Sequence, residues 1–112
     1  MRTKTLWVRE EYLDWILEGR KTIEVRVAYS NIARLEAGDS LLLNEQHPYE
    51  IRRIGRYTGF EELLAHEDPR LIAPDMEPGE LLTALRTLYP AEKEALGAIA
   101  LEICQPRHET TD

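Results

Sequence analysis

The sequence is poor in cysteine, in long apolar runs and in basic charge. Cys104 is the only cysteine among the 112 residues, so the chain cannot form an internal disulfide, which fits a reducing compartment. No apolar run approaches the roughly 20 residues that cross a membrane, and residues 1–7 lack the apolar segment of a signal peptide. We therefore expect a cytoplasmic protein that does not associate with membranes.

Acidic residues outnumber basic ones, with 21 Asp and Glu against 14 Lys and Arg and a net charge of −7. Because affinity for nucleic-acid phosphates comes largely from Lys and Arg, this balance weighs against non-specific binding to duplex DNA. The charge is uneven: residues 1–60 hold 10 basic and 9 acidic side chains, whereas residues 61–112 hold 4 and 12. A site for an anion should therefore lie in the first half, and the acidic second half should be a solvated surface.

Metal and cofactor motifs are also missing. His47, His66 and His108 are far apart in the sequence, and no spacing of Cys, His and carboxylates is typical of a metal site. The chain has neither a phosphate-binding glycine loop nor a serine elbow. We expect no metal and no cofactor, and the oligomeric state is left open.

Hydrophobic periodicity predicts a single α+β domain over residues 1–105, followed by a polar tail at residues 106–112. Gly19 suits the end of the first helix, and the odd spacing of Ile51 and Ile54 predicts a β-bulge or a register change. Residues 67–78 carry three prolines and are expected to form an irregular loop. The predicted strands are 5–8, 22–27, 41–44, 49–57 and 98–103, and the predicted helices are 10–18, 30–35, 60–65, 79–88 and 91–95.

The most informative stretch is residues 19–26, Gly-Arg-Lys-Thr-Ile-Glu-Val-Arg, where a helix pattern ends and a strand pattern begins. Strand side chains alternate between two faces, so Glu24 and Arg26 share one face and Lys21 lies at the start of the strand. Such a set can bind a polar or anionic ligand, with an ionised Glu24 acting as acceptor or base. It can also be a surface ion pair that contributes little to stability. We expect the three side chains to line one pocket. We also expect Glu24→Gln and Lys21→Ala to alter ligand binding or turnover while leaving the melting temperature nearly unchanged.

The pattern Gly-x-Lys-x-x-Glu-x-Arg, present as Gly19, Lys21, Glu24 and Arg26, resembles the signature of ASCH domains in the PUA-like superfamily. The order of the surrounding elements is similar too, from the short helix ahead of the motif to the segment Leu-Tyr-Pro-Ala-Glu-Lys-Glu near the end. The resemblance implies a small, partly closed mixed β-barrel of about five strands with inserted helices. It also implies a cleft beside the barrel, lined by Lys21, that binds RNA or a nucleoside-like small molecule.

Aromatic and basic side chains elsewhere are further candidates for ligand contacts. Trp7 and Tyr29 could stack on a base, although packing in a core or across strands is the competing interpretation. Arg52 and Arg56 could form a basic edge, since strand alternation puts them on one face and Arg53 on the other unless the bulge intervenes. The alternative is a solvated strand edge that its charges keep from aggregating.

Two enzymatic functions stay open beside ligand binding. One branch of the ASCH domains, the 4-acetylcytidine amidohydrolases, resembles this chain closely and uses a lysine, a threonine nucleophile and a downstream glutamate. Lys21 matches that lysine, but Glu24 stands where the resemblance implies the threonine, and Asp75 and Glu77 lie nearest to the downstream glutamate. Catalysis would then need Glu24 to activate water while Lys21 stabilises the oxyanion. Single-strand ribonuclease activity, which is found in some ASCH relatives, is the other alternative.

Overall fold

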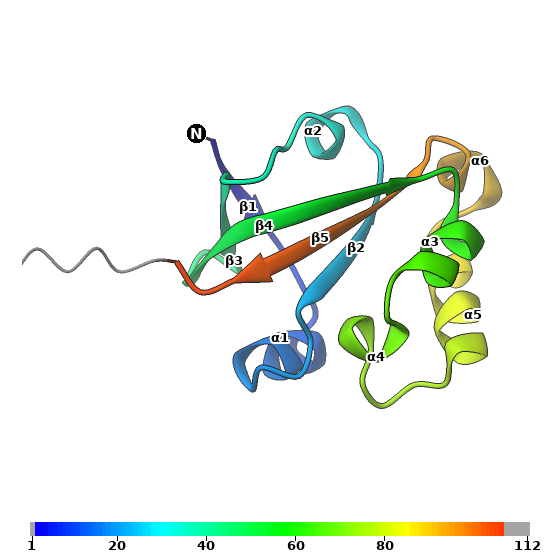
Figure 1. Ribbon diagram of the computed structural model, residues 1–112, viewed down its shortest axis with the longest axis horizontal. Coiled ribbons are helices and arrows are strands. Elements are labelled where there is room, and N and C mark those ends of the chain that lie inside the picture. Colours follow the sequence, from blue (N-terminus) through cyan, green and yellow to red (C-terminus); the bar gives the residue numbers. More distant parts are fainter. Residues whose placement is uncertain (1, 107–112) are drawn as a thin grey trace, which may run out of the picture.

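Five strands form one curled sheet, a half-barrel, in the computed structural model, which describes residues 2–106 (Figure 1). The strand order is β1-β3-β4-β5-β2, so β1 and β2 are the two edges of the sheet. β1 pairs with β3 in parallel, and the other neighbours are antiparallel. The predicted α+β class is confirmed. The strands are β1 (Thr3–Leu6), β2 (Ile23–Val27), β3 (Ser40–Leu43), β4 (His47–Tyr57) and β5 (Ala98–Cys104).

Six helices accompany the sheet within residues 2–106, and four of them lie in the connection between β4 and β5. One of these four corrects the expected irregular loop, because Asp68 accepts a hydrogen bond from the Arg70 amide and Pro69 occupies the first turn, which starts a helix. None of the helices in this part of the chain is both long and apolar enough to cross a membrane. The helices are α1 (Glu10–Leu17), α2 (Ser30–Ala33), α3 (Phe60–His66), α4 (Pro69–Ile72), α5 (Pro78–Leu88) and α6 (Ala91–Glu94).

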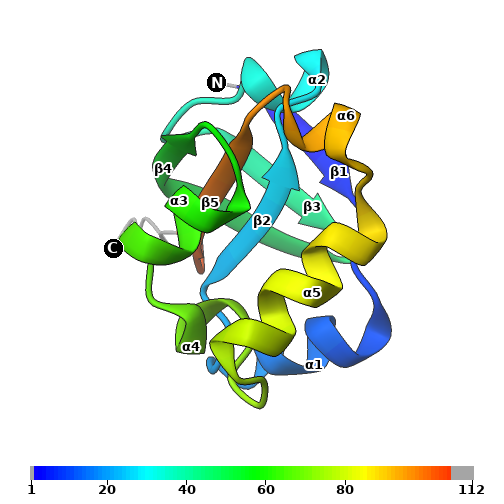
Figure 2. The same cartoon turned by 90° about the vertical axis from the view of Figure 1, so that its right-hand side faces the viewer.

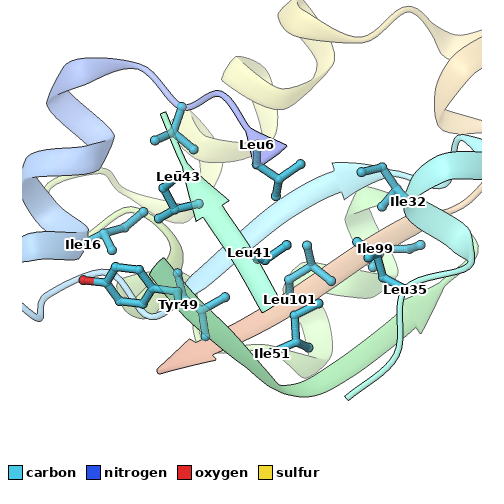
Figure 3. Close-up of a cluster of buried hydrophobic side chains, with 12 residues drawn as sticks. Leu6, Ile16, Ile32, Leu35, Leu41, Leu43, Tyr49, Ile51, Ile99 and Leu101 are labelled. Carbon is cyan, nitrogen blue, oxygen red and sulfur yellow. The ribbon is translucent and has the colours of Figure 1, made fainter. Parts of the chain in front are cut away.

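Two hydrophobic clusters cover the two faces of the sheet. The first fills the concave side and includes Leu41, Ile51 and Leu101 (Figure 3). The second lies between the sheet and the helices of the β4–β5 connection, where Phe60 and Leu63 are fully buried. β5 contributes to both clusters because its side chains alternate between the two faces of the sheet. Ile99, Leu101 and Ile103 belong to the first cluster, and Ala98 and Ala100 belong to the second.

The predicted bulge in β4 is present as a register shift between Ile51 and Arg53. Its effect on the arginines corrects the simple alternation: Arg52 and Arg53 both pair with Glu102 on β5. Arg56 instead donates to the carbonyls of Ala33 and Leu35, next to α2. Arg52 and Arg56 therefore do not form one basic edge, because the extra residue of a bulge changes which side chains share a face.

A buried carboxylate ties the end of α3 to the sheet. Glu67 directly follows α3 and accepts two hydrogen bonds from Arg53, at 2.6 and 3.1 Å, and a third from the Tyr57 hydroxyl. These bonds hold the pKa of Glu67 below its ordinary value, with the Arg53 hydrogen bonds as the main cause against the opposing effect of burial. The first helix of the long connection is thereby anchored to β4.

Gly19 ends α1 as predicted, with a φ of +80° that favours glycine. The next two amides, those of Arg20 and Lys21, both donate to the Trp15 carbonyl, at 2.9 and 3.1 Å. This turn fixes the backbone between α1 and β2. It therefore determines where the Lys21 side chain begins.

Candidate functional site

A cleft of about 200 Å³ lies where β2, the segment after β1, the start of α1 and the helices α4 and α5 meet. Figure 2 shows α5 and α1 beside β2 at this end of the molecule. One side of the cleft is apolar and the other carries charge, and three aromatic residues stand around them. The apolar side consists of Ile72, Ala73, Met76, Leu81, Ala84, Leu85 and Leu88, the charged residues are Arg9, Lys21, Glu24 and Arg26, and the aromatic ones are Trp7, Tyr12 and Tyr89.

Lys21 lines the cleft but is buried, with 4% of its surface exposed. Its ammonium donates to the carbonyls of Ile23, at 2.6 Å, and Ile72, at 2.8 Å, and pairs with Glu24 Oε1 at 3.2 Å. An ammonium has three donors, so these partners occupy all of them. Burial lowers the pKa of Lys21, and the neighbouring Glu24 carboxylate opposes that shift. Lys21 thus joins the start of β2 to the end of α4.

Glu24 lies between the two cations of the motif and is 7% exposed. Its Oε1 faces Lys21, and its Oε2 accepts from Arg26 Nε at 2.8 Å. Burial raises the pKa of this carboxyl, but the charges and hydrogen bonds of Lys21 and Arg26 outweigh burial and leave the pKa below its ordinary value. Glu24 is therefore an ionised acceptor.

Arg26 connects the two open edges of the half-barrel. Its Nη2 donates to the Trp7 carbonyl at 2.8 Å, while its Nε and Nη2 contact Glu24. Trp7 directly follows β1 and Arg26 lies in β2, so this guanidinium spans the gap between the edge strands. Its side chain is 20% exposed, and its other terminal nitrogen, Nη1, has no partner within residues 2–106. Two N–H donors of Arg26 thus stay open to a ligand.

Trp7 presents an indole at the mouth of the cleft with 62% of the residue exposed. The backbone that carries it is fixed by Asn44, whose side chain accepts from the Val8 amide at 2.8 Å and donates to the Val8 carbonyl at 3.0 Å. Val8 is buried in the concave cluster between exposed Trp7 and exposed Arg9. The cleft therefore combines an exposed aromatic surface, on a segment held by Asn44, with a carboxylate and a guanidinium.

Comparison with protein families gives a match over nearly all of the chain, since the ASCH domain matches residues 6–107. The chain belongs to the ASCH domain family. Solved structures agree with the family and with its PUA-like fold. The hypothetical protein PH0355 has 26% identity and a TM-score of 0.86, and the match covers 96% of this chain and 100% of that one.

A second similar structure is protein PF0455 from Pyrococcus furiosus, with 26% identity and a TM-score of 0.75. That match covers 92% of this ASCH domain and 96% of the other chain. No curated protein matches the sequence.

The cleft of this ASCH domain brings together four of the residues singled out from the sequence, namely Lys21, Glu24, Arg26 and Trp7. It also contains Arg9, Tyr12 and Tyr89, which the sequence analysis did not single out. Tyr89 follows the last residue of α5, and burial raises the pKa of its hydroxyl. Of these three residues, only Arg9 had a sequence signal, namely its position two residues after Trp7, a candidate for stacking on a base.

Other candidates lie away from the cleft. Tyr29 is 38% exposed and meets Lys93 on its ring face, with the ammonium 5.7 Å from the ring centroid. Arg52 and Arg56 bind Glu102 and backbone carbonyls near α2, as described above. None of these three side chains lines the cleft.

The two acidic residues nearest to the expected downstream glutamate also lie outside the cleft. Asp75 pairs with Arg20 at 2.5 Å, and Glu77 closes a capping box at the start of α5. Met76, between them, does line the cleft, so this segment contributes an apolar side chain and no carboxylate to the cleft wall. Among the cleft residues of the described chain, Glu24 is the only carboxylate. Nor does any trio of His, Cys, Asp or Glu gather in residues 2–106 in a way that could hold a metal ion.

Proposed function

We propose that the cleft of this ASCH domain binds one unpaired nucleobase, presented by a single RNA strand or by a nucleoside. The observation that carries the proposal is the exposed indole of Trp7 in the same cleft as Glu24 and Arg26. Proteins that read unpaired bases stack them on an aromatic ring and bond their edges with polar side chains. Both components meet here at one site.

The polar side of the cleft matches a base edge that places a donor beside an acceptor. Oε2 of Glu24 already takes both contacts from Arg26, whereas Oε1 faces Lys21 alone and keeps a further lone pair, so Oε1 can accept from an exocyclic amine. The open Nη1 of Arg26 can donate to a ring nitrogen or a carbonyl of the same base. The apolar residues of α4 and α5 would cover the ring.

The size and charge of the molecule favour a single base over a long nucleic-acid groove. A cleft of about 200 Å³ is smaller than the roughly 300–1,000 Å³ of pockets for drug-sized ligands. The chain carries a net charge of −7, which disfavours wide phosphate contacts. Recognition of one base by stacking and edge bonds needs neither a long groove nor a basic surface.

The geometry gives less support to hydrolysis. An oxyanion would need a donor from Lys21, yet all three donors of that ammonium are bound within the protein. Asp75 and Glu77 do not line the cleft, so no second carboxylate is offered there. Incubation with 4-acetylcytidine provides a direct check, because release of acetate by the wild type would favour the amidohydrolase over pure binding.

Calorimetric titration tests the proposal with the four ribonucleosides, short single-stranded RNAs and a random-sequence DNA duplex. We expect saturable binding of at least one nucleoside or RNA and none of the duplex. Trp7→Ala should weaken binding by about 5- to 150-fold, because stacking on an aromatic side chain contributes about 1–3 kcal/mol per base. Tyr29→Ala is the matched control, since it removes another exposed aromatic outside the cleft. Equal affinities of wild type and Trp7→Ala, or no binding at all, would refute the proposal.

A further inference from the structure

The cleft holds three cations, and two of them are already engaged by the protein. Lys21 has every donor bound, and Arg26 is held by Glu24 and the Trp7 carbonyl. Arg9 is exposed, lines the same cleft, and its side chain has no hydrogen-bond or ion-pair partner within residues 2–106. A guanidinium without a partner beside a binding cleft is well suited to a phosphate, because its planar donors match phosphate oxygens.

We propose that Arg9 binds a phosphate attached to the base that occupies the cleft, so the natural ligand is a nucleotide unit and not a bare nucleoside. This proposal rests on the function proposed above. The phosphate belongs either to a free nucleoside monophosphate or to the backbone of an RNA strand, and the chemistry at Arg9 is the same for both.

Arg9 lies two residues after Trp7, in the short segment between β1 and α1. Arg9 is the N-cap residue of α1, with φ −62° and ψ 148°. Val8, between Trp7 and Arg9, is buried in the concave cluster, and all three residues contribute to the lining of the cleft. A base stacked on Trp7 would therefore have its sugar and phosphate within reach of Arg9.

The charge around the cleft supports an anionic ligand despite the acidity of the whole chain. Arg9, Lys21 and Arg26 face a single carboxylate, Glu24, so the cleft is cationic in a protein whose net charge is −7. Glu10 and Glu11 follow Arg9 in the sequence, but neither lines the cleft nor forms an ion pair with Arg9. The positive charge of Arg9 is therefore not neutralised by a neighbour.

The test compares ligands that differ only in the phosphate. Calorimetric dissociation constants are measured for the four ribonucleosides, their 5′-monophosphates and the dinucleotides CpC and ApA, with wild type, Arg9→Ala and Arg52→Ala. We expect the monophosphate or the dinucleotide to bind about 10-fold more tightly than the matching nucleoside, and Arg9→Ala to remove that difference without weakening the nucleoside. For the ligand that carries the phosphate, the slope of log K against the logarithm of the salt concentration should be less steep in Arg9→Ala than in the wild type, by roughly one phosphate contact. Arg52→Ala, an exposed arginine outside the cleft, should change neither.

Each outcome assigns the ligand or rejects the proposal. Tighter binding of the monophosphate alone indicates a free nucleotide, and tighter binding of the dinucleotide indicates an RNA strand. Equal affinity for nucleoside and nucleotide, or an equal loss of both in Arg9→Ala, overturns the role of Arg9 while the proposed function stands. Failure of every ligand to bind the wild type overturns both. Thermal melts of Arg9→Ala should match the wild type, since that side chain makes no contact that folding needs.

Discussion

Lys21 places its charge inside the protein, where it holds two carbonyls and one carboxylate. This burial reverses the expectation from the sequence that its loss would hardly affect stability. Lys21→Met should lower the free energy of unfolding by about 3–5 kcal/mol, because it leaves Glu24 without one of its two cations and two buried carbonyls without a donor. Urea denaturation followed by circular dichroism measures the change.

Arg20→Met is the matched control for Lys21→Met, since the adjacent arginine forms only exposed ion pairs with Glu18 and Asp75. Exposed pairs contribute about 0–1 kcal/mol, so Arg20→Met should stay close to the wild type. Similar stabilities for the two variants would mean that Lys21 is not a structural tie.

At the residue scale, the sequence predicted which side chains meet but not how deeply they lie. Strand alternation is local, so the shared face of Glu24 and Arg26 follows from two residues of spacing. The burial of Lys21 comes from Ile72, which lies 51 positions away and reaches it only because α4 folds back on β2. No local pattern carries that information.

At the scale of the structural elements, one side chain in the turn after β3 holds the backbone of the segment from Trp7 to Arg9 in place. Asn44 has a φ of 51°, and its side chain bonds both the amide and the carbonyl of Val8. Asn44→Gly keeps a residue that tolerates this backbone conformation and removes only the side-chain bonds. We expect it to cost about 1–3 kcal/mol of stability, because two backbone groups lose their partners, and to weaken any ligand that needs Trp7.

Glu45→Gly is the control that distinguishes the loss of the Asn44 side-chain bonds from the effect of placing a glycine in this turn. Glu45 also has positive φ, at 61°, but it is exposed and its side chain makes no contact with Val8. It should keep both stability and affinity, as measured by thermal melts and calorimetry. If both glycine variants behaved alike, Asn44 would have no special role in holding the segment.

Structural elements with local sequence signals were predicted well. The end of α1 at Gly19 and the bulge in β4 follow from single-residue conformation and from the spacing of Ile51 and Ile54, and both are present. The helix α4 was missed because three prolines between residues 67 and 78 suggested a loop, whereas Pro69 sits at a helix start, where its ring is tolerated. Proline counts are therefore less informative than proline positions.

The whole molecule should lose stability in acid through its buried carboxylates. The pKa of Glu67 lies below its ordinary value of 4.5, chiefly because Arg53 donates to it. A carboxyl with a lowered folded-state pKa gives its full stabilisation above about pH 4.5 and loses it as the pH falls through the folded value. Glu67→Gln should therefore flatten the acid part of the stability profile by up to about 1.4 kcal/mol per pH unit.

Urea denaturation in steps from about pH 7 to about pH 2 tests this dependence. Glu61→Gln, on the exposed side of α3, should keep the slope of the wild type. An unchanged slope in Glu67→Gln would show that its carboxylate does not contribute.

The order in which the strands pair in the sheet could not be predicted from hydrophobic periodicity. The pattern predicts strands, but the order β1-β3-β4-β5-β2 pairs segments that are distant in the sequence, such as β2 with β5. The half-barrel was expected only from the family resemblance, which rested on the order of the elements and on a signature that includes Lys21, Glu24 and Arg26. Those residues mark the architecture because they tie β2 to α4 and to the segment after β1.

The signature of this chain is thus largely a set of internal ties. A lysine bound to two carbonyls and an arginine bridging two strand edges would be needed to fold such a chain whether or not its cleft held a ligand. The presence of those residues in another sequence therefore indicates the same fold, and not the same ligand. Trp7 and Arg9 make no such side-chain ties, so folding does not constrain which residues stand at these two positions. If Trp7 and Arg9 contact the ligand as we propose, grouping ASCH domains by the residues at these two positions, and not by the signature, should sort them by the molecules that they bind.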